Sequence, residues 1–305
     1  MPPSPVTLLC LCASHISTAD RADYLGHLLV SVSAQTCKKF KLFVGISFEN
    51  EDLRKQVDTQ LKSSDSSTIH VFLFSKKHTQ FERYNAVLNA LRNRKYITPE
   101  QEPNTYVSFT DDDDLWSPQR MMAFRQGAER LHTDKRNPTY MFTIKHFNMD
   151  IEMRDFIHWD QLPMKEENFF GLAHPREYCD ILCKFTLFAH WFDVASPELL
   201  AHPFCDMALT KWITLKFTIK DNERRDVDLR MNCPVPLYYY RQSDRNAPFY
   251  SQKASRRPSV SEVEEMMSQL LLHRQLYDCS WDFFFFFYGD NRVLKKVLQC
   301  PIADR

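Results

Sequence analysis

Hydrophobic and polar positions follow two different periods along the first part of the chain. Short runs rich in β-branched and aromatic residues are typical of buried strands. Between these runs, apolar residues recur at the spacing of one helix face. The predicted strands are residues 6–13, 41–47, 69–74 and 106–110, and the predicted helices are residues 22–35, 49–61, 81–93 and 118–132. This alternation predicts an α/β fold with a mostly parallel central sheet flanked by helices.

The pattern changes in the second half, where strands follow one another with few helices between them. The predicted strands here are residues 140–149, 152–159, 184–194 and 229–241, and the predicted helices begin at Ser196 and at Asp206. The first two strands are predicted to pair antiparallel through a turn near Asp150. The last strand is placed at a sheet edge, because Pro234 and Pro236 cannot donate hydrogen bonds to a neighbour. A small antiparallel part therefore follows the parallel one.

Composition narrows the class of protein. The chain has 305 residues, of which 44% are hydrophobic, so a sizeable core is expected. Lys plus Arg (39) equals Asp plus Glu (39), which gives no overall charge signal for nucleic acid. The nine cysteines form no CxxC pair, as in proteins of reducing compartments. With no basic leader and no apolar run of ~20 residues, a cytoplasmic protein without a transmembrane segment is predicted.

Four consecutive aspartates, Asp111–Asp114, follow the strand at residues 106–110. In open α/β sheets, ligands bind at the carboxyl ends of the strands. Carboxylates packed together repel one another, and their hard oxygen atoms suit Mg²⁺ or Mn²⁺. The alternative is an acidic loop that caps the next helix, which Ser117 and Pro118 are predicted to begin. Capping accounts for one or two aspartates, so a metal or phosphate site is the preferred interpretation.

Several short motifs, in order, resemble those of glycosyltransferases with the GT-A fold, particularly the large inverting family 2. The resemblance covers residues 6–245. The motifs are Ser31 to Thr36 with the following strand (S-x-x-x-Q-T), Phe81 to Asn85 (arN), Phe109 to Pro118 (l-D-x-D-D-x-w-x-P) and Leu237 to Arg241 (YR). The second strand departs from the family pattern, because it ends in Gly45-Ile-Ser-Phe-Glu49 without the usual acidic pair.

The resemblance implies a domain organisation. Residues 1–245 would form a Rossmann-like GT-A catalytic domain, with a nucleotide-sugar-binding half (1–132) and an acceptor half (133–245). Residues 246–305 would form a linker and a C-terminal helical extension. Within that extension, the run Phe283–Phe287 is too short to span a membrane. It is expected to pack on the catalytic domain, with peripheral membrane or partner contact as the alternative.

The resemblance also implies roles for the acidic run and its surroundings. Asp113 matches the metal-binding carboxylate, and Asp111 matches a position near the ribose or a metal-bound water. Asp112 is counted with the cofactor-binding residues, and Asp114 either joins them or caps the next helix. Ser14, after the first strand, is expected to contact the nucleobase or to lie idle in a loop.

Three further positions complete the expected site. Arg83 would meet a base or phosphate, or else be a solvated helix-face arginine. Inversion requires a carboxylate that takes a proton from the acceptor hydroxyl. Asp206 is the candidate, with an N-cap as its alternative role and with Asp193 and His202 as fallbacks. Arg241 begins a basic segment that would close over the diphosphate or act only as a charged linker.

The sequence therefore predicts a metal-dependent inverting glycosyltransferase, with Mn²⁺ or Mg²⁺, a nucleotide-sugar donor (a UDP-sugar) and a glycan or other hydroxyl acceptor. Two alternatives remain open. One is a nucleotidyltransferase, which normally carries a glycine- and lysine-rich loop that residues 13–17 lack. The other is a non-catalytic nucleotide- or glycan-binding module on the same scaffold. Donor sugar, acceptor, linkage and oligomeric state are not determined by the sequence.

Overall fold

The protein is described from a computed structural model. The described residues are 6–62, 67–133, 141–149, 178–201, 205–206, 209, 218–220, 226–228 and 230–241. The predicted strand at 152–159, most of the predicted helix at 206–217 and the whole of residues 242–305, including Phe283–Phe287, lie outside them.

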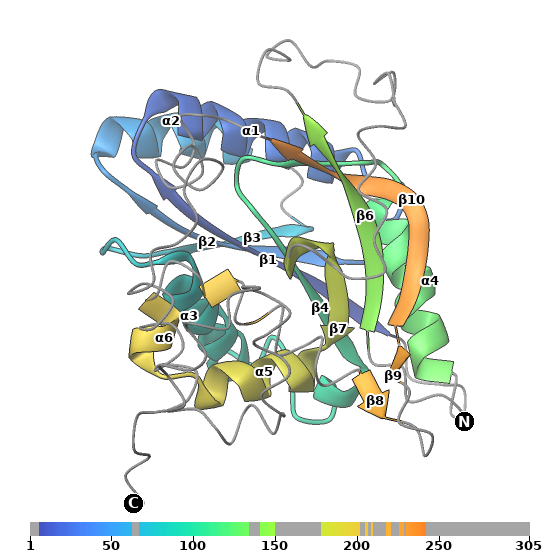
Figure 1. The fold of residues 1–305 in the computed structure, drawn as a ribbon. Helices are drawn as coiled ribbons and strands as arrows, with labels where there is room; N and C mark the ends of the chain where they lie inside the picture. Colours follow the sequence, from blue (N-terminus) through green and yellow to red (C-terminus); the bar gives the residue numbers. More distant parts are fainter. Residues whose placement is uncertain are drawn as a thin grey trace, which may run out of the picture.

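An eight-stranded sheet forms the centre of the fold, in the order β3-β2-β1-β4-β7-β6-β10-β5 (Figure 1). The strands are β1 (Thr7–Ile16), β2 (Lys41–Phe48), β3 (Ile69–Leu73), β4 (Thr105–Thr110), β5 (Leu115–Trp116), β6 (Met141–Met149), β7 (Ile181–Lys184) and β10 (Arg230–Arg241). The first four strands run parallel, whereas β7 is antiparallel to both β4 and β6. Strands β8 (Thr218–Lys220) and β9 (Asp226–Asp228) form a separate antiparallel pair. The predicted mostly parallel sheet with a small antiparallel part is confirmed.

Helices cover both faces of the sheet, as β-α-β connections require. They are α1 (Ala19–Ser33), α2 (Glu51–Lys62), α3 (Gln80–Asn93), α4 (Arg120–Thr133), α5 (Phe185–Val194) and α6 (Pro197–Ala201), with the short 3₁₀ turns η1 (Glu102–Asn104) and η4 (Tyr178–Asp180). In Figure 1, α1 and α2 lie above the parallel strands and α3, α5 and α6 lie below them.

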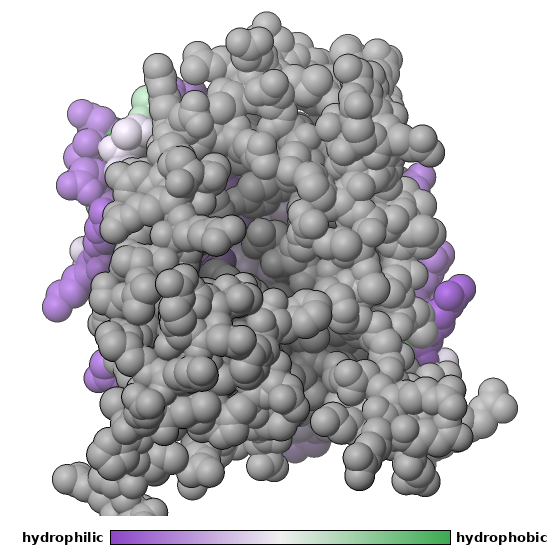
Figure 2. Space-filling view, in the orientation of Figure 1, coloured by the Kyte–Doolittle hydropathy of each residue, from purple (hydrophilic) through white to green (hydrophobic). Residues whose placement is uncertain are grey.

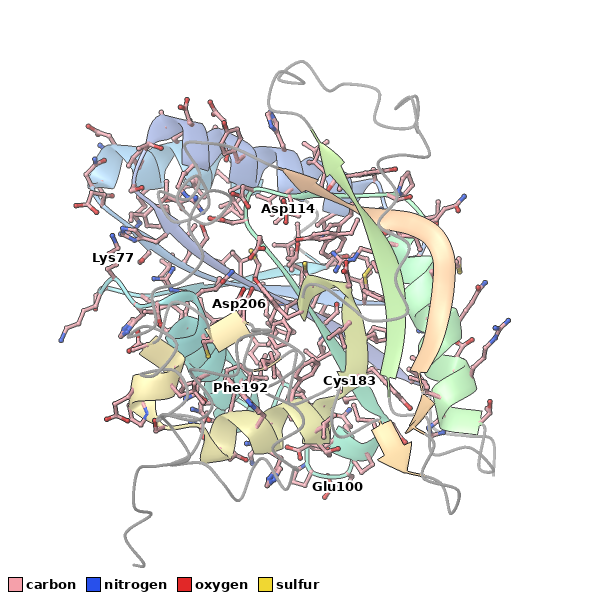
Figure 3. The ribbon with its side chains drawn as sticks, viewed as in Figure 1. Lys77, Glu100, Asp114, Cys183, Phe192 and Asp206 are labelled. Carbon is pink, nitrogen blue, oxygen red and sulfur yellow. The ribbon has the colours of Figure 1, made fainter. Side chains whose placement is uncertain are left out.

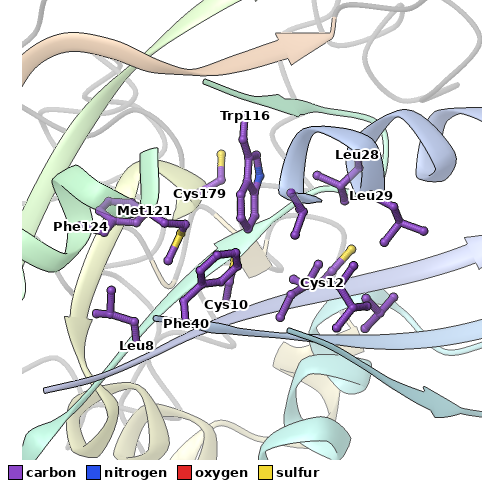
Figure 4. Packing of buried hydrophobic residues seen from close by; sticks show 14 of the residues in the cluster. Leu8, Cys10, Cys12, Leu28, Leu29, Phe40, Trp116, Met121, Phe124 and Cys179 are labelled. Atoms are coloured by element: carbon purple, nitrogen blue, oxygen red, sulfur yellow. The ribbon is translucent and has the colours of Figure 1, made fainter. Parts of the chain in front are cut away.

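Two hydrophobic cores lie on opposite faces of the sheet. Alternate residues of β1 contribute to each of them, because successive side chains of a strand point to opposite faces. Leu8, Cys10 and Cys12 pack with α1 and α4, and Figure 4 shows them with Leu28, Trp116 and other members of this cluster. Leu9, Leu11 and Ala13 pack instead with α3 and α5. The six cysteines that the structure describes are free and buried.

The outer faces of the helices are polar. In Figure 2 the described residues at the left and right margins of the molecule are mainly hydrophilic. On α2, the Arg54 side chain lies within salt-bridge distance of Glu51 and Asp58. In the part of the chain that the structure describes, no helix has the length and apolar character needed to cross a membrane.

One predicted element of the second half was wrong. The strand predicted at 184–194 ends at Lys184, and α5 follows. Phe185, Phe188 and Phe192 are buried in the core at helical spacing, so the apolar residues of this run follow the period of a helix face. The helix predicted at 118–132 is confirmed as α4, which begins at Arg120. The Ser117 hydroxyl accepts from the Gln119 amide at 3.4 Å, and the Ser117 amide donates to Leu237 O at 3.1 Å.

The described strands of the second half pair within the large sheet. The predicted antiparallel pairing of residues 140–149 with 152–159 stays a prediction, because 152–159 lie outside the described residues. Strand β6 pairs with β7 and, in parallel, with β10. The register of β10 shifts on both sides of Pro236. Among the described strands, β5 covers β10 only at Tyr238 and Tyr239, so the proline segment does lie at a sheet edge, as predicted.

Candidate active site

The carboxyl ends of β1, β2 and β4 bring the candidate residues together. In the parallel register Cys12 lies beside Thr110 and His15 beside Ser47. The four aspartates that follow Thr110 therefore emerge next to Ser14 at the end of β1. Strand β7 runs antiparallel on the other side of β4, so the parallel part of the sheet ends beside the aspartates. The strand order reverses between β1 and β4, because β2 and β3 follow on one side of β1 and β4 on the other. Open α/β sheets bind ligands at such a reversal.

Asp111 is held by two donors from separate parts of the chain. Its Oδ1 accepts hydrogen bonds from Gln80 Nε2 and from the Tyr178 hydroxyl. Gln80 is the first residue of α3, whose N-terminus is fixed by a capping box between Thr79 and Glu82. Burial raises the pKa of the Asp111 carboxyl to about 6, and the two hydrogen bonds oppose that shift. The carboxylate of Asp111 is thus oriented before any ligand binds.

Asp112 ties the end of β1 to the first turn of α1. It is buried, with Oδ2 accepting from the Ser14 hydroxyl at 2.5 Å and Oδ1 accepting from Arg21 Nη2 at 2.5 Å. The Asp112 charge is the main cause that raises the pKa of Arg21 further above its ordinary value. Ser14 and Asp112, both predicted to bind the cofactor, therefore contact each other.

Asp113 and Asp114 differ in exposure. The Asp113 side chain keeps 16% of its surface exposed, against 5% for Asp112, and its Oδ2 lies 4.0 Å from Arg21 Nη1. Asp114 is fully buried, and the Tyr238 hydroxyl donates to its Oδ2 at 2.5 Å. Asp114 is not the N-cap of α4, which begins at Arg120. Of these two, Asp113 is the carboxylate that a ligand can reach.

Arg83 lies in the interior and not on a solvated helix face. Its exposed fraction is 1%. Its guanidinium donates to the carbonyl oxygen of Ser14 and, at 2.8 Å, to Ser47 Oγ. Burial lowers the pKa of Arg83, and the nearby Asp112 charge opposes that shift. Arg83 thus joins the carboxyl ends of β1 and β2 from below.

The end of β2 carries a polar chain in place of the family's acidic pair. His15 Nδ1 is hydrogen-bonded to Ser47 Oγ at 2.9 Å, and its Nε2 lies 3.2 Å from Glu49 Oε2. Burial lowers the pKa of His15. The Ser47 hydroxyl also accepts from Arg83, so one continuous hydrogen-bonded group lines this part of the sheet edge.

Asp206 approaches the aspartate run from the second half of the chain. Its charge is among those that raise the pKa of Asp111. The neighbouring Cys205 and Leu209 are buried in the core below the sheet, and this anchors the short helical segment that carries Asp206. In the view of Figure 3, Asp206 lies between the labelled Asp114 and Phe192.

The remaining predicted residues lie elsewhere or outside the described part. Asp193 on α5 forms a salt bridge with Arg92, which also pairs with Glu102 just before β4. That places Asp193 at the amino ends of the parallel strands, away from the aspartates. His202 lies outside the described residues, and of Arg241 only the backbone, at the end of β10, is described.

The donor set of the aspartate run fits a hard divalent cation. Within the described residues, no three His, Cys, Asp or Glu side chains form a group that could hold a metal ion by themselves. The protein does not need to supply every ligand, because Mg²⁺ in phosphate-handling sites is bound through one or two carboxylates plus phosphate oxygens and water. Asp113, with Asp111 beside it, supplies carboxylates of this kind.

Four residues that hold the aspartates were not identified from the sequence: Arg21, Gln80, Tyr178 and Tyr238. One signal was available. Arg21 lies in the first turn of α1, where its amide donates to the Thr18 cap. A cation there opposes the helix dipole, so its position indicates a partner elsewhere, and that partner is Asp112.

Neither a protein-family model nor a curated protein sequence matches the chain, but solved structures do. TarS 1–349 of S. aureus in complex with UDP matches with a TM-score of 0.53 and 13% identity, over 96% of this chain and 75% of that chain. The same protein with UDP-GlcNAc matches at 0.53 and 13%, over 96% and 71%.

A second protein gives a similar result. The mannosyltransferase PcManGT from Pyrobaculum calidifontis, in complex with GDP-Man and Mn²⁺, matches with a TM-score of 0.53 and 12% identity, over 97% of this chain and 74% of that chain. At such low identity the likeness concerns the fold alone. The chain has the GT-A fold, as the sequence motifs predicted.

Proposed function

We propose that the protein is a metal-dependent inverting glycosyltransferase that transfers a sugar from a UDP-sugar to a hydroxyl group of a glycan or another acceptor. The observation that carries this proposal is the aspartate run at the carboxyl edge of the parallel strands, with Asp113 partly exposed and Asp111 oriented by its hydrogen bonds. The fold supports it, because TarS and PcManGT of the same fold were solved with UDP-GlcNAc and with GDP-Man and Mn²⁺.

Asp113 is assigned to the cation, with Asp111 beside it and directed toward the ribose or a metal-bound water. A divalent cation at that position supplies Lewis-acid neutralisation of the charge that develops on the leaving diphosphate. The protein's own contribution is orientation, since Gln80 and Tyr178 hold Asp111 in one rotamer. Ser14 and Arg83 shape the adjacent wall, where the nucleobase is proposed to lie.

Asp206 is assigned as the general base that accepts the proton of the acceptor hydroxyl. Two features support this role. Its segment is anchored in the core through Cys205 and Leu209, and its charge acts on Asp111. An acceptor bound between the two halves of residues 1–245 would then meet the donor sugar beside Asp206. Arg241 and the basic residues after it are proposed to close over the diphosphate.

Donor turnover tests the proposal directly. The purified chain is incubated with a panel of UDP- and GDP-sugars, with Mn²⁺, with Mg²⁺ or with EDTA, and released nucleoside diphosphate is measured. We expect release of UDP from one UDP-sugar that requires the cation. The same panel, read as a thermal shift, detects binding without turnover, because a ligand of the native state raises stability. Binding alone would favour the non-catalytic module, and neither response with any donor would refute the proposal.

A further inference from the structure

The pair formed by Arg21 and Asp112 is not explained by the proposed chemistry. Asp112 is buried, and both of its oxygens are used within the protein, one by Ser14 and one by Arg21. The Arg21 guanidinium bridges Asp112 and Asp113, at 2.5 Å from one carboxylate and 4.0 Å from the other. It keeps 23% of its surface exposed, more than either aspartate. A fixed positive charge therefore stands beside the carboxylate assigned to the metal.

The position of Arg21 in its helix indicates that this pairing is specific. Arg21 follows the Thr18 cap by three residues, and a cation in the first turn of a helix is disfavoured by the helix dipole. The Asp112 carboxylate offsets that cost and fixes the guanidinium by a charge-assisted hydrogen bond. Removing Arg21 would leave Asp112 buried with the Ser14 hydroxyl as its described hydrogen-bond donor.

We propose that Arg21 is a positioning residue that makes cation binding at Asp113 depend on the nucleotide. This inference rests on the proposed function. In the absence of nucleotide, the Arg21 charge repels a divalent ion that approaches Asp113. The affinity of the nucleotide-free site for the ion is therefore low. A nucleoside diphosphate carries two or more negative charges, which attract both the divalent ion and the Arg21 guanidinium. Its oxygen atoms also serve as ligands of the ion. Asp112 acts as the anchor of Arg21 and does not ligate the ion.

This arrangement has a measurable consequence, because coupling between two ligands is reciprocal. In the wild-type protein, UDP strengthens Mn²⁺ binding, and Mn²⁺ strengthens UDP binding by the same factor. Without the Arg21 charge, Mn²⁺ binds more tightly in the absence of nucleotide and the coupling becomes smaller. A mutation that only damages the structure would weaken Mn²⁺ binding, so tighter binding distinguishes the two explanations.

The test is a titration of the full chain with Mn²⁺, in which electron paramagnetic resonance reports the free ion, with and without UDP. Arg21→Gln is expected to bind Mn²⁺ about tenfold more tightly without UDP, the size expected for one unit charge near a divalent ion at high effective dielectric constant. Arg21→Lys keeps the charge and is expected to stay close to wild type. Arg54→Gln removes an equal charge from the outer side of α2 and is expected to change nothing.

The double variant Arg21→Gln with Asp112→Asn examines the role of Asp112. It removes one charge of each sign, so Mn²⁺ affinity is expected to return to the wild-type value. Loss of binding in this variant would make Asp112 a ligand and overturn the assignment of an anchor.

Two failures can be told apart. If the wild-type chain binds Mn²⁺, if Asp113→Ala abolishes that binding, and if Arg21→Gln binds no more tightly, then the inference is wrong and the proposed function stands. If the wild-type chain binds no Mn²⁺ with or without UDP, then both are wrong.

Discussion

The Tyr238 hydroxyl donates a hydrogen bond to Asp114 Oδ2 at 2.5 Å and accepts one from the Asp111 amide at 3.1 Å. A single phenol from the last described strand thus fixes both ends of the four-aspartate run. Tyr238 is fully buried, and the guanidinium of Arg120 lies over its ring at 4.5 Å. Burial raises the pKa of Tyr238, with the Asp114 charge acting in the same direction. The phenol therefore stays protonated and keeps donating.

Tyr238→Phe is expected to lower the free energy of unfolding by about 1–3 kcal/mol, because the buried Asp114 carboxylate and the partly buried Asp111 amide lose their partner. Urea denaturation followed by circular dichroism measures the change. Tyr96→Phe is the matched control, since Tyr96 is 40% exposed and surface substitutions usually stay within about 0.5 kcal/mol. Equal effects of the two substitutions would show that the hydroxyl of Tyr238 contributes nothing to the aspartate run.

Asp113→Ala is expected to abolish the cation-dependent part of donor binding and to lower turnover by about 10²–10³-fold, the size seen when one electrostatic contact to a transition state is removed. Thermal shift with Mn²⁺ and UDP-sugar measures binding, and UDP release measures turnover. Asp58→Ala, on the exposed side of α2, serves as the charge-matched control. Full turnover in the Asp113 variant would remove this residue as the metal ligand.

Asp206→Asn separates binding from chemistry. The amide keeps the size of the side chain but cannot accept the acceptor proton, so transfer is expected to fall by about 10²–10⁴-fold while UDP-sugar binding stays at the wild-type value. Isothermal calorimetry with the donor and a transfer assay with the acceptor measure the two quantities. Transfer at the wild-type rate would leave Asp206 with a structural role only.

Gly45→Ala is expected to destabilise the site by disturbing the packing of α3 against β2. An added Cβ would lie 2.7 Å from Val87 Cγ2 and 2.9 Å from Arg83 Cγ, and such overpacking typically costs about 1–3 kcal/mol. It would also displace the Arg83 guanidinium from Ser14 and Ser47. Thermal denaturation and UDP affinity are expected to fall together.

Gly26→Ala provides the contrast. Here the three heavy atoms nearest to the added Cβ all belong to the end of the flexible Gln60 side chain, and alanine is favoured over glycine within a helix by about 0.5–1 kcal/mol. Stability is expected to stay level or to rise slightly. A loss as large as that of Gly45→Ala would contradict the difference between a rigid and a flexible neighbour.

The first half of the fold could be predicted because its signals are local. Each strand from β1 to β4 and each helix from α1 to α4 shows its period within its own sequence, and the order β-α-β then determines the parallel sheet. The error at α5 arose where an apolar run is too dense for its period to be obvious. Its helical spacing becomes clear only when Phe185, Phe188 and Phe192 are counted together.

The residues that form hydrogen bonds to the aspartates could not be predicted in the same way. Asp111 and Asp113 were predicted as site residues from their motif, but the residues that hold the aspartates come from distant positions. Arg21 and Asp112 are 91 residues apart, and Tyr238 and Asp114 are 124 apart. Nothing in the local sequence specifies which of several tyrosines or arginines reaches an aspartate, because this depends on how strands β7 and β10 are inserted beside β4 and β6.

The link between β10 and the aspartates also bears on how the protein is made. The ribosome releases the N-terminal strands first, and domains begin to fold in that order. The acidic run therefore leaves the ribosome well before the strand that contains Tyr238, and contacts between positions so distant in sequence form slowly. Until β10 docks, the aspartates lack the phenol that fixes them, so the geometry of the acidic run is completed only when this late strand joins the sheet.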